Sequence, residues 1–541
     1  EIFGSMFQAA LEPGERHQAG AHYTSEEIIQ RTIRPLFLDS LWDEFYKCRR
    51  NDSFKKLHKK IKNLSFLDPA CGCGNFLILA YKELRYLENQ ILIKLHRSGD
   101  SPMQAVLDIS QLVQISIDQF YGLEIDSFAC EVSKLGLWLT EHQMNIETGK
   151  LFGQYFSSIP LKENNQIICA DALLVDWDTL NTDGMTFIFG NPPYLGTREQ
   201  SSEQKTSLAY ALDQIPGYKK LDFVCGWFYL ASKYLSENQL SKAAFVSTNS
   251  ILMGEQPSRL WQPIFNFGIE IDFGYKSFIW KSDLPNTAGV HCVILGLSQG
   301  SKNKYLYDAE LGQPIFGVPV RKINYTLIEG ENIFLDLNRG ESISGLPKIN
   351  YGSLPYDNGL GLIWSEEDYQ SIINEYPNAE KYFKPYLDGR SITNNTAKYC
   401  LWLPDDFPKE LLSISKIANS IQNIREFRLS SKRQATRMQA ETPYRFGEIR
   451  YKDQPYIAMP VVSSGNREYL PVKYIDNGSV NSSKAMAIYT NNIWLVGLLA
   501  SKIHLVWVDV YGGKFKSDFQ YSTDLYKNFP MPEISEDIKS K

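Results

Sequence analysis

The sequence lacks any uninterrupted apolar run of the roughly 18 residues that a membrane-spanning helix needs. Its most apolar long stretch, Trp494 to Val510, is interrupted by Lys502, His504 and Asp509. We therefore expect no membrane-embedded segment.

Paired cysteines are also lacking. The eight cysteines stand singly apart from Cys71 and Cys73, none has CxxC spacing, and no secretory leader is recognisable. This distribution argues against a disulfide framework and against a zinc site, so no metal is expected. It favours a reducing, cytoplasmic location.

A general excess of basic residues is missing as well, since the net charge is −6. A mean over a long chain hides local asymmetry, however. Residues 425–437 form a basic stripe in which Glu426 is the only acid, and its cations are Arg425, Arg428, Lys432, Arg433 and Arg437. We predict that this stripe follows the phosphates of a nucleic acid.

The composition that is present is that of a globular protein, with 43% hydrophobic and 22% charged residues and enough length for about two or three domains. From Phe66 to about Ser298, short β-rich runs alternate with amphipathic helical stretches, which is typical of an α/β sheet covered by helices. Seven candidate strands lie in SFLDPA, FYGLEID, QIICAD, TFIFGN, KAAFVS, IEIDFGY and GVHCVILGL.

The strongest glycine-rich motif is DPACGCGNF, residues 68–76, between the first candidate strand and a helix. Glycines allow a close backbone approach and a sharp turn into the helix, whose N-terminal amides face the bound group. The segment is neither a P-loop nor the GxGxxG fingerprint. It predicts a site for a nucleotide-like cofactor, with a purely structural turn as the alternative.

Acidic residues follow the next two candidate strands. Glu124, which precedes Ile125, is placed to accept the ribose hydroxyls of a cofactor, although its gap of about 50 residues from the glycines exceeds the roughly 20 of dinucleotide folds. Asp171 is placed to accept from an adenine amino group while the Ala172 amide meets a ring nitrogen. A solvated strand edge and a helix N-cap are the ordinary alternatives.

The decisive motif is Asn191-Pro192-Pro193-Tyr194, directly after TFIFG. The Asn191 side-chain oxygen and the Pro192 carbonyl can hold both N–H groups of an exocyclic amine, which frees the nitrogen lone pair. Two prolines rigidify the loop and remove amide donors. Tyr194 offers a flat face to a base turned out of a duplex. The alternative is a Pro-Pro turn that caps a strand.

Two further elements give weaker signals of function. His22-Tyr23-Thr24 precedes a helix that begins near Ser25, and it is either a cofactor contact or part of an ordinary helix start with Ser25 as N-cap. Phe278 and Trp280 are either core aromatics or a second support for the extruded base.

Together these motifs resemble the gamma class of amino-methyltransferases, in which a motif like His22-Tyr23-Thr24 precedes the glycine motif, NPPY follows and a recognition domain comes last. The whole chain resembles the methyltransferase and recognition portions of the type IIL restriction–modification enzymes typified by MmeI. The stretches that carry this resemblance are GAHYTSEE, DPACGCGNFL, NPPYLG, STNSI followed by GEQ, AETPYRFGEIR and KSDFQYS.

The resemblance implies S-adenosylmethionine as cofactor, N6-adenine methylation of one strand of double-stranded DNA, and a nuclease domain ahead of the methyltransferase. We find no PD-(D/E)xK nuclease site in the sequence, which opens at Glu1 within a helical pattern. A nuclease domain is therefore expected upstream, unless the methyltransferase stands alone. The catalytic residues implied are Asn191, Pro192, Pro193 and Tyr194. The cofactor contacts implied are Tyr23, Thr24, Asp68, Ala70, Cys71, Gly72, Gly74, Asn75, Phe76, Glu124, Ile125, Asp171 and Ala172.

The predicted fold is α/β in three parts. Residues 1–60 form a helical segment in which Pro35 starts or kinks a helix, and residues 61–304 form a seven-stranded Rossmann-like S-adenosylmethionine-dependent methyltransferase domain. Residues 305–541, rich in turn signals, form a mixed α+β target-recognition domain. DNA contacts are predicted for Phe278, Arg433, Arg437, Ser464, Asn466, Arg467, Lys514 and Lys516, and solvated surface is the alternative for each polar one.

Several other functions fit parts of this pattern. Methylation of cytosine N4 would use the same amine-holding loop, and the motif order favours adenine without deciding it. A methyltransferase of a BREX- or DISARM-type phage-defence system fits the same architecture. A protein or RNA methyltransferase would not need the long recognition domain, and an inactive specificity subunit would not need Asn191 and Tyr194.

Overall fold

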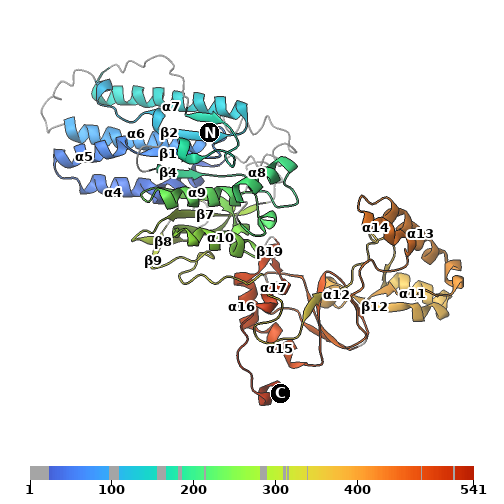
Figure 1. Cartoon of the computed structure of the whole chain (residues 1–541). Coiled ribbons are helices and arrows are strands. Elements are labelled where there is room, and N and C mark those ends of the chain that lie inside the picture. Colours follow the sequence, from blue (N-terminus) through green and yellow to red (C-terminus); the bar gives the residue numbers. More distant parts are fainter. Residues whose placement is uncertain are drawn as a thin grey trace. The chain divides into compact units, whose positions relative to one another are not determined.

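The computed structural model describes residues 24–96, 109–154, 166–180, 186–212, 215–280, 289–308, 312, 316–337, 339–476, 478–515 and 518–540. By their internal contacts these residues form two compact units. The first comprises residues 1–252 and 256–334, and the second comprises residues 253–255 and 335–541. The colours of Figure 1 run from blue to yellow-green in the first unit and from yellow to red in the second.

The first unit is built on a mixed sheet of nine strands in the order β3-β2-β1-β4-β5-β7-β6-β8-β9. The strands are β1 (Ser65–Asp68), β2 (Phe120–Glu124), β3 (Ile167–Cys169), β4 (Thr186–Gly190), β5 (Lys242–Thr248), β6 (Glu270–Trp280), β7 (Val290–Ser298), β8 (Lys304–Tyr307) and β9 (Gly317–Val320). Strands β1 to β5 pair in parallel, and β7 lies antiparallel to both β5 and β6. The sheet is wider than the predicted seven strands, because β8 pairs with β6 and β9 with β8.

Helices connect these strands, as the alternating sequence pattern predicts. They are α3 (Glu26–Ile33), η1 (Arg34–Leu38), α4 (Asp39–Lys47), α5 (Asn51–Lys62), α6 (Asn75–His96), η2 (Ile109–Gln111), η3 (Ile117–Gln119), α7 (Ser127–Phe152), η4 (Trp177–Leu180), α8 (Ser202–Leu212), η5 (Tyr218–Lys220), α9 (Cys225–Glu237), η6 (Asn249–Leu252) and α10 (Gln256–Asn266). Pro35 lies at the start of η1, a π-helical stretch between α3 and α4, where its missing amide donor disturbs the regular helical ladder.

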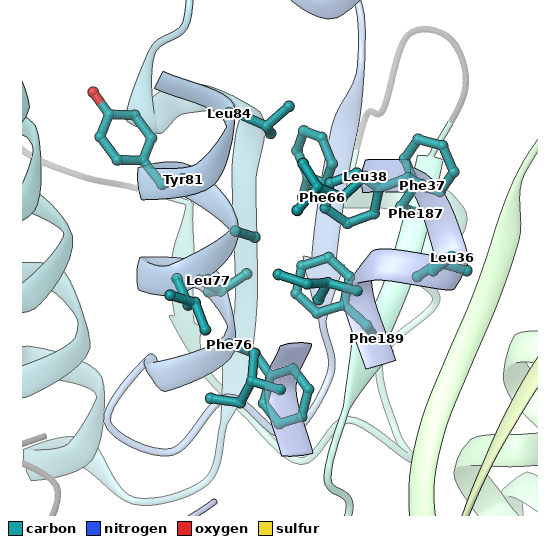
Figure 2. Close-up of a cluster of buried hydrophobic side chains, with 14 of the residues drawn as sticks. Leu36, Phe37, Leu38, Phe66, Phe76, Leu77, Tyr81, Leu84, Phe187 and Phe189 are labelled. Carbon is teal, nitrogen blue, oxygen red and sulfur yellow. The ribbon is translucent and has the colours of Figure 1, made fainter. Parts of the chain in front are cut away.

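The main core lies between the sheet and the helices α3 to α6. Figure 2 shows Phe66 of β1 and Phe187 and Phe189 of β4 packed between residues of η1 and of α6. The ring centroids of Phe37 and Phe66 are 5.2 Å apart, and those of Phe76 and Phe189 are 6.0 Å apart. Because strand side chains alternate between faces, the opposite face has its own core. The aromatic contacts between α9, β5 and α10 belong to that second layer.

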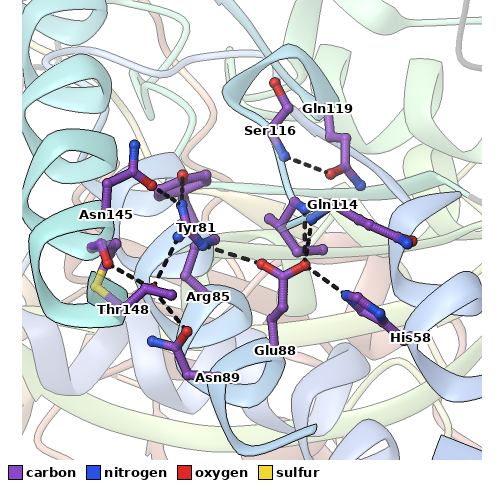
Figure 3. Close-up of polar contacts among 12 residues, drawn as sticks. His58, Tyr81, Arg85, Glu88, Asn89, Gln114, Ser116, Gln119, Asn145 and Thr148 are labelled. Atoms are coloured by element: carbon purple, nitrogen blue, oxygen red, sulfur yellow. Dashed lines mark hydrogen bonds and ion pairs between the residues drawn. The ribbon is translucent and has the colours of Figure 1, made fainter. Parts of the chain in front are cut away.

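A buried polar network joins α5, α6 and α7 to the segment that precedes η3 (Figure 3). Glu88 Oε1 accepts from the amides of Gln114 and Ile115 at 2.7 and 3.1 Å and lies 2.8 Å from His58 Nε2. Arg85 pairs with the other Glu88 oxygen at 3.2 Å and donates to Asn145 at 2.9 Å. Charges buried this deeply are tolerated only when they are paired and hydrogen-bonded. The network therefore fixes how these helices are arranged.

The second unit contains three small sheets with the strand orders β10-β18-β14-β16, β11-β13-β12-β17 and β15-β20-β19. Its strands are β10 (Ile349–Tyr351), β11 (Ile363–Ser365), β12 (Phe383–Leu387), β13 (Lys398–Leu401), β14 (Tyr456–Pro460), β15 (Val462–Ser463), β16 (Lys473–Ile475), β17 (Val480–Asn481), β18 (Ala485–Tyr489), β19 (Gly513–Phe515) and β20 (Asp518–Gln520). Its helices are α11 (Glu366–Glu375), η7 (Pro377–Tyr382), α12 (Gly389–Asn394), η8 (Lys409–Ser413), α13 (Ser415–Leu429), α14 (Gln434–Met438), η9 (Gln439–Glu441), α15 (Trp494–Ala500), α16 (Lys502–Tyr511), α17 (Thr523–Lys527) and α18 (Glu536–Ser540). The unit is thus of mixed α and β content.

One member of the predicted basic stripe is not on the surface. Arg428, at the end of α13, is fully buried, and its five N–H groups donate to five backbone carbonyls, those of Pro355, Tyr356, Gln439, Thr442 and Arg445, at 2.7 to 3.1 Å. Burial lowers the pKa of its guanidinium. The prediction that Arg428 meets phosphates is therefore wrong. Its side chain joins the loop before β11 to the turns around η9.

Within the described parts of the chain, no single helix is both long and apolar enough to cross a membrane; α15 and α16, bent by 50° at their junction, meet the length and composition criterion only as a pair.

Candidate active site

The glycine motif and the NPPY motif meet at the carboxyl ends of adjacent parallel strands. Strand β1 pairs with β4 through Phe66 opposite Phe187 and Leu67 opposite Ile188. Just beyond these pairs, a Cβ atom on Gly190 would lie 2.4 Å from Asp68 Oδ1. Only glycine fits at position 190 without displacing the Asp68 carboxyl group. The two motifs, more than a hundred residues apart in sequence, therefore share one site.

The turn between β1 and α6 depends on its glycines. Gly72 and Gly74 have φ angles of +52° and +82°, a region that residues with a Cβ rarely adopt. A Cβ on Gly74 would also lie 2.4 Å from Ser133 Oγ on α7. Asn75 starts α6, while Phe76 and Cys71 are buried. Of the predicted cofactor residues in this turn, Gly72 and Gly74 shape the backbone, whereas the side chains of Cys71 and Phe76 pack in the core beneath the turn.

Asp68 is the most perturbed acid of the site. Its Oδ1 accepts from the Ala70 amide at 3.1 Å, and no group among the described residues donates to its buried Oδ2. Burial raises the pKa of Asp68 to about 8; the Ala70 hydrogen bond opposes this rise, and the charge of Glu124 adds to it. A buried acceptor without a donor fits a ligand that brings an amino or hydroxyl group.

Glu124 connects the turn to the end of β2. Its Oε2 accepts from the Gly72 amide at 2.8 Å, and its Oε1 accepts from the amides of Ile125 and Asp126 at 2.9 and 3.0 Å. Burial raises the pKa of Glu124, and these three amides oppose the rise. A carboxylate has about four acceptor positions, so capacity for a ligand hydroxyl remains on Oε2. The Ile125 side chain beside it is 71% exposed.

Asp171 and Ala172 follow β3, whose Cys169 lies opposite Glu124 in the ladder. The side chain of Asp171 accepts from the Leu173 amide at 2.9 Å, and the Ala172 carbonyl accepts from the Trp177 indole at 3.0 Å. Asp68, Glu124 and Asp171 therefore end three neighbouring parallel strands. Three acceptors on one edge, with exposed apolar surface next to them, fit a cofactor that has amine, hydroxyl and aromatic parts.

Asn191 follows β4 and is oriented by the N-terminal part of the chain. Its Nδ2 donates to the buried Thr24 hydroxyl at 3.1 Å. Its Oδ1 is buried and receives no hydrogen bond from the portion of the chain that is described. With the amide nitrogen held by Thr24, the oxygen is the atom left for a substrate donor.

Pro192 and Pro193 continue the loop to Tyr194, which packs against the main core. Burial, together with the neighbouring Cys292 thiol, raises the pKa of the Tyr194 hydroxyl well above its usual range, although a side-chain interaction with Asn191 opposes the rise. The hydroxyl end of Tyr194 is thus held in the protein interior and stays protonated.

Residues 222–227, a segment that hydrogen-bonds to both motifs, were not singled out from the sequence. Asp222 Oδ1 accepts from the Leu195 amide at 3.0 Å, directly after Tyr194. Five residues further on, the Trp227 indole donates to the Pro69 carbonyl of the glycine motif at 2.9 Å. A lone acid just before the apolar stretch FVCGWFYL was the available signal, because such residues often end loops at helix starts.

Phe278 and Trp280 lie on β6 and are buried, with 3% and 9% of their surface exposed. The Arg31 guanidinium lies 5.8 Å from the Phe278 ring centroid and 5.6 Å from that of Tyr275. The structure therefore places Phe278 in the core against a cation, and its ring is not open to a base in this arrangement.

The predicted DNA-contacting residues of the second unit fall into two groups. The exposed turn that carries Ser464, Asn466 and Arg467 follows β15, and Lys514 lies on β19 of the same sheet. Gly465 donates to Asp518 of β20 at 3.2 Å, which holds this turn to the sheet. Lys514 also pairs with Asp509 at 2.9 Å.

The other group lies after α13. Arg433 and Arg437 are both exposed, and Arg437 also donates to the carbonyls of Ser431 and Lys432 at 2.8 and 2.9 Å. Tyr23 and Lys516, two further predicted contacts, lie outside the described residues. Over the described ranges, no three His, Cys, Asp or Glu side chains are grouped as metal ligands.

Two family models match the chain. The model described as "MmeI, DNA-methyltransferase domain" matches residues 45–308, and the one described as "MmeI, target recognition domain" matches residues 329–533. Among solved structures, the type IIL restriction-modification enzyme MmeI in complex with DNA superposes with a TM-score of 0.90 at 38% identity, covering 100% of this chain and 72% of that one.

Curated relatives agree with these matches. DNA methyltransferase A of Bacillus subtilis (strain 168) is 37% identical over 545 residues, which covers 99% of this chain and 60% of that protein. A putative type II restriction enzyme and methyltransferase of Methanocaldococcus jannaschii is 26% identical over 163 residues, 26% of this chain and 13% of that protein. The chain thus spans less than two thirds of the length of either relative.

Proposed function

The chain belongs to the MmeI family, whose methyltransferase and target recognition domains it carries. We propose that it methylates adenine N6 in a specific double-stranded DNA sequence. In this proposal it is the modifying and DNA-reading part of a type IIL restriction–modification enzyme. The strands β1 to β7 form its Rossmann-like cofactor sheet. One observation carries the proposal: the glycine motif and the NPPY motif share one site. In that site Asn191 Oδ1 has no donor among the described residues, and the preceding residue, Gly190, lies so close to Asp68 that a Cβ would not fit.

The residues at the ends of β1, β2 and β3 would hold S-adenosylmethionine. Asp68 Oδ2 would accept from its amino group, Glu124 from a ribose hydroxyl and Asp171 from the adenine amine, and Ile125 would contact the adenine. When bound, this cofactor supplies an electrophilic methyl group on a sulfonium centre. Glycines 72 and 74 let the backbone approach the ligand closely.

Asn191 Oδ1 and the Pro192 carbonyl form an amine clamp on the target base. The N6 nitrogen of adenine is a poor nucleophile because its lone pair is delocalised into the ring. Two acceptors that hold its N–H groups favour the tetrahedral nitrogen of the transition state, and preorganised acceptors lose no energy to reorganisation. Thr24 fixes which end of the Asn191 amide faces the amine. After the nitrogen gains the methyl group it carries a positive charge and loses one N–H proton to water, so no strong general base is needed. Positioning of the amine provides most of the rate enhancement.

The base reaches this loop only when it leaves the duplex. Tyr194, held by the core, supports the extruded ring. The second unit supplies the sequence-reading contacts through the exposed turn with Ser464, Asn466 and Arg467, and Arg433 meets phosphate.

Asn191→Ala tests the clamp. We expect methyl transfer to DNA to be lost. The affinity for S-adenosylhomocysteine, measured by calorimetry, should stay within about threefold of wild type, because the removed hydrogen bond is to the target base and not to the cofactor. Asn63→Ala, at an exposed position after α5, is the matched control and keeps full activity. Unchanged turnover in Asn191→Ala contradicts the assignment of Asn191 to the amine. So does a loss of S-adenosylhomocysteine binding that parallels the loss of activity.

A further inference from the structure

The loop that carries the amine clamp is held at both ends. At its start, Gly190 belongs to the ladder between β4 and β5. At its end, Leu195 donates through its amide to Asp222 Oδ1 at 3.0 Å and accepts at its carbonyl from the Phe223 amide at 3.0 Å. Both backbone polar groups of Leu195 are therefore bound by one segment.

Asp222 is itself held in place. Its Oδ1 also accepts from the Val224 amide at 3.3 Å, and its own amide donates to Gln256 Oε1 at 3.1 Å. Only 6% of the residue is exposed. Burial raises its pKa to about 6, although the amides of Val224, Leu195 and Phe223 oppose the rise.

A buried acid of this kind costs folding free energy. An apolar residue of similar volume would fill the same space without the desolvation penalty of a carboxylate. Departures from the most stable choice concentrate at functional sites. Asp222 is hydrogen-bonded to Leu195, the residue after Tyr194. It can therefore influence the position of the loop that carries the amine clamp.

A second side chain supports the same point of the loop. Gln200 is 5% exposed, and its Nε2 donates to the Leu195 carbonyl at 2.9 Å and to the Leu221 carbonyl at 3.1 Å. Leu195 is thus bound by two buried side chains and one backbone amide. Four residues between two fixed ends, two of them prolines with restricted φ, leave the loop few conformations.

We propose, on the basis of the proposed function, that Asp222 is a positioning residue for methyl transfer: by binding the Leu195 amide it sets where the Pro192 carbonyl and the Asn191 side chain lie. It touches neither substrate nor cofactor. Its effect is on the geometry of the amine clamp, where a displacement of about 1 Å can lower the rate on the order of 100-fold.

Two substitutions separate this role from the charge of the group. Asp222→Asn keeps an oxygen that can accept from both amides, whereas Asp222→Leu keeps the volume and removes the acceptor. We expect kcat in Asp222→Leu to fall by roughly 10- to 100-fold with the KM for S-adenosylmethionine within about threefold of wild type, and Asp222→Asn to keep most of kcat. Equal kcat in Asp222→Leu and wild type, or equal losses in the Leu and Asn variants, overturns the proposal.

A readout without catalysis keeps the two proposals distinct. Amide hydrogen exchange at Leu195, measured without DNA or cofactor, accelerates in Asp222→Leu and stays slow in Asp222→Asn if Asp222 holds this amide. If wild type methylates no DNA, the proposed function fails, while the exchange result still tests the hold on Leu195. If Asp222→Leu does not fold, Asp222→Ala takes its place, because it removes the same acceptor with a smaller side chain. We expect it to lower kcat with little change in KM, and unchanged kcat in that variant overturns the proposal.

Discussion

The Asn191 side-chain amide donates to the Thr24 hydroxyl across 167 positions of sequence. The bond determines which atom of the amide is available, because the nitrogen is engaged and the oxygen is not hydrogen-bonded within the described parts of the chain. In the free amide the two ends are nearly equal in size, so a packing contact alone would not distinguish them. Thr24, expected from its motif to contact the cofactor, thus also orients the residue proposed to hold the substrate.

The first prediction concerns this bond. Thr24→Val keeps the shape of the side chain and leaves Asn191 Nδ2 without its acceptor. Loss of a buried hydrogen-bond partner costs about 1–3 kcal/mol, or roughly 5- to 150-fold in rate, and we expect kcat at saturating cofactor to fall by that amount. Thr24→Ser retains the hydroxyl and serves as the control. Equal rates for the Val and Ser variants would show that the orientation of Asn191 does not depend on this bond.

The second prediction concerns the contact between the two motifs. A Cβ on Gly190 would lie 2.4 Å from Asp68 Oδ1, whereas one on Gly196 meets no described atom within 4 Å. Gly190→Ala should therefore displace Asp68 and lower the affinity for S-adenosylhomocysteine at least about tenfold, with an overpacking cost of about 1–3 kcal/mol in stability. Gly196→Ala, in the same loop, should change neither. Calorimetric titration and thermal unfolding distinguish the two variants, and normal binding by Gly190→Ala would argue against a shared site.

Sequence patterns predicted those features that depend on neighbouring residues. The glycine turn, the acid at the end of β2 and the NPPY loop are continuous segments, and their strand-turn-helix context follows from local periodicity. Strands β8 and β9 have four residues each. They escaped prediction because, unlike the equally short β1 and β3, they adjoin no motif that marks the end of a strand. Their pairing depends on the edge of the sheet that is formed by β6.

Contacts between distant segments could not be predicted in this way. The hydrogen bond from Leu195 to Asp222 and that from Trp227 to Pro69 exist only after the chain has folded. Arg428 shows the same limit for charge. In the sequence it is one of several cations in a basic stripe, and only the carbonyls of distant loops make it a buried structural group. Phe278 likewise lies beneath Arg31, which α3 supplies.

The third prediction is a pH dependence. The pKa of Asp68 is about 8 in the folded chain, against an ordinary value of 3.8, so the folded state binds this proton more tightly than the unfolded state does. Its contribution to stability is therefore complete at pH below 3.8 and is lost as the pH rises to about 8. Asp68→Asn, which mimics the neutral acid, should gain stability relative to wild type by up to about 1.4 kcal/mol per pH unit between pH 5 and 8.

Urea denaturation of both proteins without cofactor, at several pH values in this range, measures that difference. The comparison between variants removes the contribution of other titrating groups. A stability difference that does not change with pH would mean that the Asp68 carboxyl group has an ordinary pKa.

The fourth prediction separates structural from surface arginines in the second unit. Lysine has three donors where arginine has five, so Arg428→Lys leaves at least two of the five carbonyls unsatisfied. We expect it to destabilise the second unit by several kcal/mol, on the order of 3. Arg433→Lys, at an exposed position of the same basic stripe, should be within about 0.5 kcal/mol of wild type. Similar unfolding midpoints for the two variants would contradict the buried role of Arg428.

Identification of the methylated base shows directly whether the amine clamp acts on adenine N6. DNA that contains many sequences is incubated with the purified protein and S-adenosylmethionine with a labelled methyl group, digested to nucleosides and separated by chromatography. We predict that the label is recovered as N6-methyladenine and is absent when Asn191→Ala replaces the wild type. Recovery as N4-methylcytosine, or undiminished label with Asn191→Ala, would contradict it.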